Sequence, residues 1–130
     1  MKNVVIINEA HSLLSEQEKI LKEKFGTYEF FYVPKNGWSY EDQRRIALEL
    51  MEGGRKNIIF VSPVPVLLAF IGFYKGYGQA GIDIGQPFIG CSIDLYLFHN
   101  DHREKKELPD GRIIQVVSHA GWQLVEIKSI

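Results

Sequence analysis

The chain has 130 residues, of which 45% are hydrophobic and 24% are charged, and its formal net charge is −1. These values are typical of one soluble globular domain, so residues 1–130 are expected to fold as a single domain. A nearly neutral chain has no overall positive field to attract long nucleic acid, although a local cluster of cationic side chains can still bind a small anionic ligand.

Cys91 is the only cysteine, so no internal disulfide can form. We interpret it as a small core residue in a protein of the reducing cytoplasm. The first residues pass directly into a strand-like sequence, and no signal peptide is recognised there. The apolar run Ile58–Tyr74 contains Ser62, Pro63 and Pro65. These residues favour a strand, a turn and a helix over a membrane span, so no membrane partner is expected.

The first half of the chain predicts two strands, each followed by a helix. Ser15 and Glu18 have the spacing of a capping box, with Ser15 as the N-cap, and Gly26 is suited to the end of that helix. Pro34 stops the second strand, which is aromatic and β-branched. The strands are expected at residues 3–8 and 28–33, and the helices at 15–25 and 39–51.

The second half predicts further strands, one more helix and a hairpin. Pro65 suits the first helical position, and Pro109-Asp110-Gly111 is a turn sequence. Strands are expected at 57–61, 92–98, 104–108, 112–117 and 123–127, a helix at 66–77, and a glycine-rich connection at 78–90. This order predicts an α/β fold with a mainly parallel sheet flanked by helices and a C-terminal antiparallel hairpin extension.

Polar residues follow two of the buried strands. The loop Glu9–Ser12 comes after the first strand, and His99–Arg103 follows the strand at 92–98. Three of the four histidines, His11, His99 and His102, lie in these segments. Because open α/β sheets bind ligands at the carboxyl ends of their strands, the sequence predicts a site at one edge of the sheet.

Two familiar motifs are matched only in part. Residues 76–81 fit the dinucleotide-binding pattern G-x-G-x-x-G by letter, and Asp101 lies about twenty residues on. However, the pattern must follow a strand and open a helix, and Gly85 and Pro87 would break a helix there. His99 and His102 have a spacing that could suit a metal, but they follow a strand end without a further cluster of ligands, so no metal site is predicted.

Two other features admit both a functional and a purely structural interpretation. Basic and acidic residues interleave in Arg103–Glu107, and this segment is either a solvated strand face or an edge that faces phosphate. Exposed aromatic residues can stack on bases, whereas most aromatic residues pack in cores or interfaces. The aromatic residues in question are Trp38, Tyr40, Tyr74 and Tyr77.

Both ends of the chain resemble a known family. Residues 7–18, INEAHSLLSEQE, and residues 102–112, HREKKELPDGR, resemble small stand-alone CRISPR-associated proteins. Those proteins have a strand, a loop with Asn and His, a "(T/S)-x-E-Q" helix start, and a basic strand with a Pro-Asp-Gly hairpin. They are similar to CARF domains, which have Rossmann-like folds and form homodimers. Residues 72–90 depart from the family pattern.

The resemblance implies a function and a set of site residues. Several such proteins are ring nucleases of the prokaryotic cytoplasm that cleave cyclic oligoadenylate, typically cyclic tetra-adenylate, without a metal or other cofactor, and so switch off type III CRISPR signalling. His11 or His102 would transfer protons, and Arg103 would stabilise phosphate charge. The implied ligand-binding residues are Asn8, Ser12, Ser62, Asn100 and, as a further candidate, Lys106.

Two alternatives remain open from the sequence. The same dimer could bind or sense cyclic oligoadenylate without cutting it. Alternatively, a small α/β protein with this architecture could bind another nucleotide or metabolite at the same strand-end edge.

Overall fold

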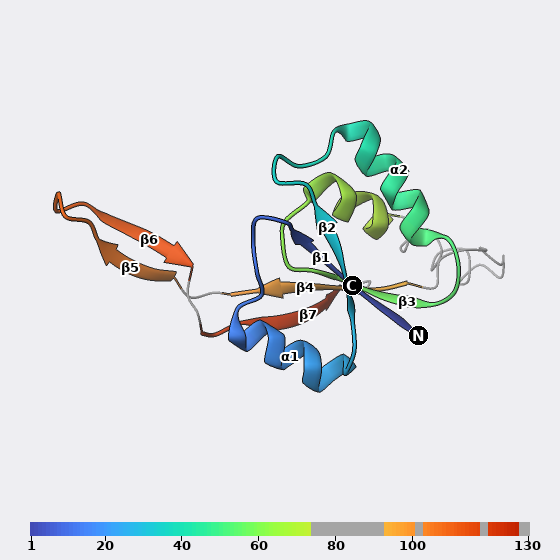
Figure 1. The fold of residues 1–130 in the computed structure, drawn as a ribbon, viewed down its shortest axis with the longest axis horizontal. Helices are drawn as coiled ribbons and strands as arrows, with labels where there is room; N and C mark the ends of the chain where they lie inside the picture. Colours follow the sequence, from blue (N-terminus) through green and yellow to red (C-terminus); the bar gives the residue numbers. More distant parts are fainter. Residues whose placement is uncertain (74–92, 101–102, 118–119, 128–130) are drawn as a thin grey trace.

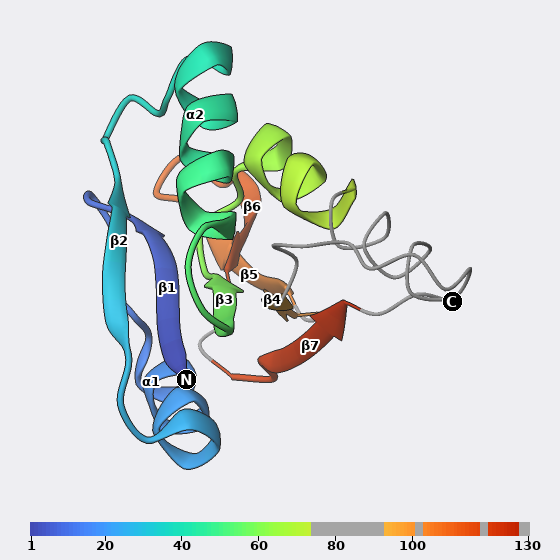
Figure 2. The ribbon, with the colours of Figure 1, turned by 90° about the vertical axis from the view of Figure 1, so that its right-hand side faces the viewer.

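The protein is described from a computed structural model that covers residues 1–73, 93–100, 103–117 and 120–127. Its centre is a five-stranded sheet with the strand order β2-β1-β3-β4-β7. The first four of these strands run parallel, and the edge strand β7 runs antiparallel to β4 (Figures 1 and 2). The bounds of the five strands are Lys2–Asn8 for β1, Glu29–Val33 for β2, Lys56–Phe60 for β3, Ile93–His99 for β4 and Gln123–Ile127 for β7.

Helices cover both faces of this sheet. Helix α1 (Ser15–Phe25) lies on one face, and α2 (Tyr40–Met51) lies on the other together with a helix that begins at Pro65 and is described to residue 73 (Figure 1). Since strands covered on both faces lose the usual polar alternation, β1 carries the continuous buried run Val4–Ile7. The expected mixed α/β fold with a mainly parallel, helix-flanked sheet is therefore confirmed.

Two apolar clusters hold the layers together. The larger one joins the sheet to α2 and to the helix at 65–73, and includes Ile6, Ile46, Phe60 and Leu67. The smaller one joins the sheet to α1 and centres on Leu21, which is fully buried. Each buried side chain of this size stabilises the fold by about 1.5–3 kcal/mol.

Strands β5 (Arg103–Glu107) and β6 (Ile113–Val117) form a separate antiparallel sheet of two strands. We name this hairpin, residues 103–117, the arm. It projects from the body beyond the end of β4 (Figure 1). Gly111 in its turn has a φ of +86°, a left-handed backbone conformation that favours glycine. The predicted hairpin extension is thus present, and it stands apart from the main sheet.

The start of α1 differs from the predicted capping box. Ser15 is the first helical residue, and Leu14 occupies the N-cap position without a capping side chain. The capping-box hydrogen bond back to the N-cap residue is made by Gln17, whose Oε1 accepts the Leu14 backbone N–H at 3.0 Å. Glu18 instead accepts a hydrogen bond of 2.6 Å from Lys22 one turn later. The sequence placed the box one residue too late because Gln and Glu can both serve at its third position.

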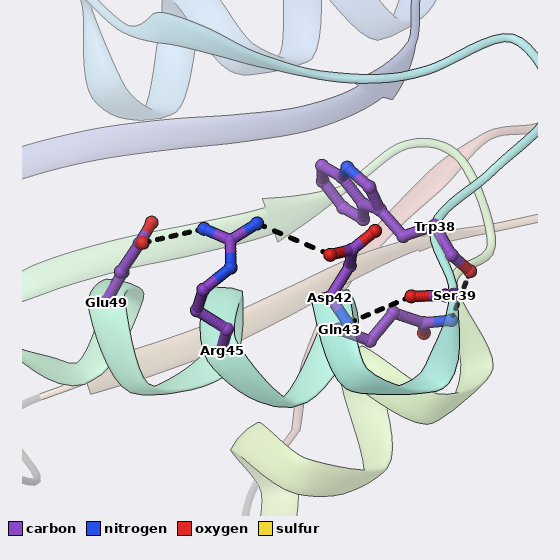
Figure 3. Close-up of polar contacts among 6 residues, drawn as sticks. All are labelled: Trp38, Ser39, Asp42, Gln43, Arg45 and Glu49. Atoms are coloured by element: carbon purple, nitrogen blue, oxygen red, sulfur yellow. Dashed lines mark hydrogen bonds and ion pairs between the residues drawn. The ribbon is translucent and has the colours of Figure 1, made fainter.

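The start of α2 agrees with the prediction (Figure 3). The Ser39 hydroxyl accepts the Asp42 backbone N–H at 3.1 Å, as expected of an N-cap. Gln43 then connects three segments, because its amide nitrogen donates to the Trp38 carbonyl at 3.1 Å and its Oε1 accepts the Leu67 N–H at 3.0 Å. Leu67 lies in the first turn of the next helix, whose N–H groups have no partner within that helix.

The predicted strand bounds agree with the structure to within one residue at each end. Pro65 begins its helix as expected. The glycine-rich connection at 78–90, the motif at 76–81 and Cys91 lie outside the described residues. No helix in the described parts of the chain is both long enough and apolar enough to cross a membrane.

Candidate functional site

A cleft of about 350 Å³ lies at the carboxyl ends of β3 and β4. We name it the strand-end cleft. Its volume is at the lower end of the range for small-molecule sites. The lining comes from the ends of both strands, from the turn before the helix at 65–73, and from the residue before β7. It comprises Phe60, Val61, Ser62, Pro63, Val64, Pro65, Leu68, Leu97, Phe98, His99, Asn100 and Trp122.

Ser62 follows β3 and is hydrogen-bonded to the end of β1 at this edge of the sheet. The backbone N–H of Asn8 donates to the Ser62 hydroxyl oxygen at 2.8 Å. The N–H groups of Val61 and Ser62 both donate to the Ile6 carbonyl, at 2.9 and 3.2 Å. The Ser62 side chain is therefore held at the end of β1, and its hydroxyl proton can still be donated to a ligand.

The turn Pro63–Pro65 forms one wall of the cleft. Proline lacks a backbone N–H, so Pro65 occupies the first helical position without losing a hydrogen bond. The N-terminal end of a helix carries a partial positive charge from its aligned peptide dipoles. This end of the helix, at Pro65, borders the cleft and favours a negatively charged group there.

Asn100 and Trp122 form another wall of the cleft. The Asn100 side chain is 4% exposed, and its amide nitrogen donates to the Ala120 carbonyl at 2.8 Å. The backbone N–H of Trp122 donates to Glu16 of α1 at 3.1 Å. The indole packs edge-on against Phe98, with ring centres 6.3 Å apart and an interplanar angle of 87°. These contacts join Asn100, which precedes the arm, to Ala120, which follows it, and hold Trp122 against α1 and β4.

His99 is the last residue of β4 and has an exposed side chain. Among the described residues that line the cleft, it is the one titratable side chain. An imidazole has one ring nitrogen that can donate a hydrogen bond and one that can accept a proton. The cleft thus combines an apolar and aromatic interior with a hydroxyl, an amide and an imidazole.

The loop after β1 lies outside the lining of the cleft. The Asn8 side chain makes hydrogen bonds to nearby loops: Oδ1 accepts the Ala10 N–H at 2.9 Å, and Nδ2 donates to the Pro34 carbonyl at 3.3 Å. His11 and Ser12 are exposed. The structure therefore brings Ser62 and Asn100 together in the cleft, and it places the three candidates of the first loop elsewhere on the same edge.

The remaining candidates follow β4. His102 lies outside the described residues. Arg103 is the first residue of β5, where only its backbone is described. Lys106 is exposed on the arm, opposite Ile114 of β6, and is not part of the cleft lining.

Sequence reasoning missed Trp122 and did not select His99. Trp122 reaches the cleft because β7 pairs with β4, which brings residue 122 beside Phe98. The sequence shows a strand at 123–127 but not its neighbour in the sheet. His99 belongs to the polar segment after the strand at 92–98 but is not among the residues that the family resemblance implies, and its position as the last strand residue is the signal that could have selected it.

No group of three or more His, Cys, Asp or Glu side chains suited to a metal ion occurs among the described residues. Comparison with protein-family models, with curated proteins and with solved structures finds no match for this chain.

The Ser62–Asn8 contact gives a direct test of how the edge is built. Replacing Ser62 by alanine should lower the free energy of unfolding by about 1–2 kcal/mol, because the Asn8 N–H loses its partly buried acceptor. Urea denaturation followed by circular dichroism measures this change. Ser12→Ala is the control: that serine is exposed, and a change within about 0.5 kcal/mol is expected. Equal effects of the two substitutions would contradict the structural role of Ser62.

Proposed function

We propose that the protein binds cyclic oligoadenylate at the strand-end cleft and cleaves it, as a ring nuclease that ends type III CRISPR signalling. The observation that carries the proposal is the cleft at the carboxyl ends of two adjacent parallel strands, on the edge of the sheet where open α/β proteins bind ligands. The family resemblance of residues 7–18 and 102–112 supports the choice of ligand. The mainly parallel α/β architecture is compatible with a Rossmann-like domain.

The cleft offers contacts suited to an adenine base. Trp122 supplies an aromatic surface, and stacking of a base on such a side chain contributes about 1–3 kcal/mol. The Ser62 hydroxyl can donate a hydrogen bond to a ring nitrogen or to a ribose oxygen. Asn100 keeps this wall in place through its bond to Ala120.

The phosphates need positive charge from other sources. The helix that begins at Pro65 contributes a partial positive charge at its N-terminal end. Arg103 follows Asn100 by three residues, and we assign it to the phosphate, since guanidinium binds phosphate in a bidentate manner. A cleft of about 350 Å³ is small for a whole ring. A homodimer with two-fold symmetry would offer two clefts to a ligand with matching symmetry.

The reaction in this proposal is an internal transesterification. The ribose 2′-oxygen attacks the adjacent phosphorus and the bond to the 5′-oxygen breaks, which gives a 2′,3′-cyclic phosphate and a free 5′-hydroxyl. One group accepts the 2′-hydroxyl proton and another protonates the 5′-oxygen. His99 lines the cleft and joins His11 and His102 as a candidate for these transfers. Alignment of the attacking oxygen and stabilisation of charge by Arg103 supply the remaining catalysis.

One observation favours a second candidate, a module that binds the ring without cutting it. The Ser62 oxygen and the Asn100 amide are already engaged in hydrogen bonds within the protein, as expected of residues that shape a site. The described lining also contains no carboxylate, lysine or arginine. A long incubation that leaves bound ligand intact would select this alternative.

Calorimetric titration with cyclic tetra-adenylate, cyclic hexa-adenylate and linear tetra-adenylate tests the binding step. We expect saturable binding of a cyclic ligand, with one ring for each two chains. Arg103→Ala should weaken binding at least about tenfold, because it removes a charge-assisted contact. Arg44→Ala, at an exposed position of α2, should bind as the unmodified protein does. Failure of all three ligands to bind would refute the proposed function.

A further inference from the structure

The arm exposes two large apolar side chains to solvent, Ile113 and Ile114. Its strands pair with each other and with no further strand in the described structure. Ile113 is 67% exposed and Ile114 is 40% exposed, although both are β-branched residues suited to the interior of a sheet. A two-stranded hairpin alone is marginally stable in water. The arm therefore has the properties of an element that another surface covers.

The two strands of the arm differ in a way that indicates which edge is covered. All five residues of β5 are charged (REKKE), whereas β6 has no charged residue (IIQVV). Charged side chains, lysine above all, protect edge strands against pairing, and uncharged β-branched strands invite it. By this pattern β5 is an outer strand, and β6 is an inner strand whose second edge pairs with no strand in the described parts of the chain.

We propose that two copies of the chain pair through β6, antiparallel, about a two-fold axis at Gln115. The product is a four-stranded sheet in which the two β6 strands lie inside and the two β5 strands lie outside. In this register Ile114 of one copy lies opposite the partner's Val116, and each Gln115 faces its counterpart. A second copy fits this edge because an uncharged strand centred on Gln115 is complementary to itself under a two-fold axis.

The pairing also completes the strand-end cleft. A strand of five residues spans about 17 Å, and Asn100 and Ala120, which precede and follow the arm in the chain, are hydrogen-bonded to each other, with Asn100 in the cleft lining. Antiparallel overlap of two such strands brings the turn of one arm to the base of the other. Arg112, directly after the turn, would then lie beside the partner's cleft, whose described lining lacks a cationic side chain. The β6 pairing is independent of the ligand, whereas this role of Arg112 rests on the proposed function.

Within one arm, Arg112 bonds Asp110 through Nε at 2.6 Å, and its side chain is 75% exposed. This contact uses one of five guanidinium donors and leaves the terminal nitrogens for a phosphate. We therefore infer that Arg112 is a binding residue for the anionic ligand of the partner's cleft.

Introducing a charge at Gln115, on the proposed axis, tests the pairing. The unmodified protein should have twice the 14.9 kDa mass of one chain by light scattering. Gln115→Lys and Gln115→Glu should each be monomeric, because like charges directly opposite each other disfavour pairing. An equimolar mixture of the two should recover the dimer mass. Lys105→Glu, on the outer strand opposite Gln115, should remain dimeric. A monomeric unmodified protein, or a mixture that stays monomeric, would overturn the proposed pairing.

A second measurement isolates the role of Arg112. Arg112→Ala should keep the dimer mass and bind cyclic tetra-adenylate about tenfold more weakly. Lys19→Ala removes an exposed cation from α1 and should leave affinity unchanged. Unchanged affinity in Arg112→Ala would overturn its role while leaving the β6 pairing in place. A dimer that follows the Gln115 results but binds no cyclic oligoadenylate would refute the proposed function and the role of Arg112, and would leave the pairing supported.

Discussion

Replacing Leu21 by alanine is expected to lower the free energy of unfolding by about 2–5 kcal/mol. Leu21 is fully buried in the cluster that joins α1 to the sheet, so its truncation removes apolar contacts and leaves a cavity. For a domain of 130 residues each kcal/mol shifts the melting temperature by about 3–4 °C, so a decrease of roughly 6–20 °C is expected. Thermal and urea denaturation followed by circular dichroism measure the effect.

Leu48→Ala is the matched control. Leu48 also lies inside a helix, but it is 47% exposed on α2. Truncation there removes little buried area, and a change within about 0.5 kcal/mol is expected. If the two leucines had equal effects, α1 would not pack on the sheet as described.

Replacing Trp122 by alanine should weaken the binding of cyclic oligoadenylate by about 5- to 150-fold. This range corresponds to the loss of about 1–3 kcal/mol from one stacked base. Trp122→Phe keeps an aromatic surface and should recover most of the affinity. Calorimetric titration gives the affinities, and a thermal melt of each variant establishes that it is folded.

Trp38→Ala is the control for loss of an indole. Trp38 packs against Phe31 at a ring-centre distance of 5.8 Å, near the start of α2 and outside the cleft lining. This variant should lose stability and keep its affinity. Equal weakening by the two tryptophan substitutions would show that Trp122 does not contact the ligand.

Strands and helices could be predicted well because their residues repeat at the spacing of each element. The buried run Val4–Ile7 indicates a strand covered on both faces, and Ser39 marks the start of α2 as its hydroxyl contact requires. The α1 start was misplaced by one residue, because neighbouring Gln17 and Glu18 are equally good capping residues in a sequence.

The site could be predicted only in part. Ser62 and Asn100 are implied by the family resemblance, and both follow buried strands and line the cleft. Trp122 could not be placed there, since its position depends on the pairing of β7 with β4. Likewise, the sequence of Arg103–Glu107 shows that all five residues are charged, but it does not show that this strand belongs to an arm separate from the main sheet.

The measurement that tests the central claim most directly is incubation of the protein with labelled cyclic tetra-adenylate in EDTA, followed by separation of the products. The proposed function predicts conversion to linear di-adenylate that ends in a 2′,3′-cyclic phosphate, with turnover lost in Arg103→Ala and kept in Arg44→Ala. A ligand that stays intact in the presence of the unmodified protein, with and without added divalent metal, would contradict ring-nuclease activity.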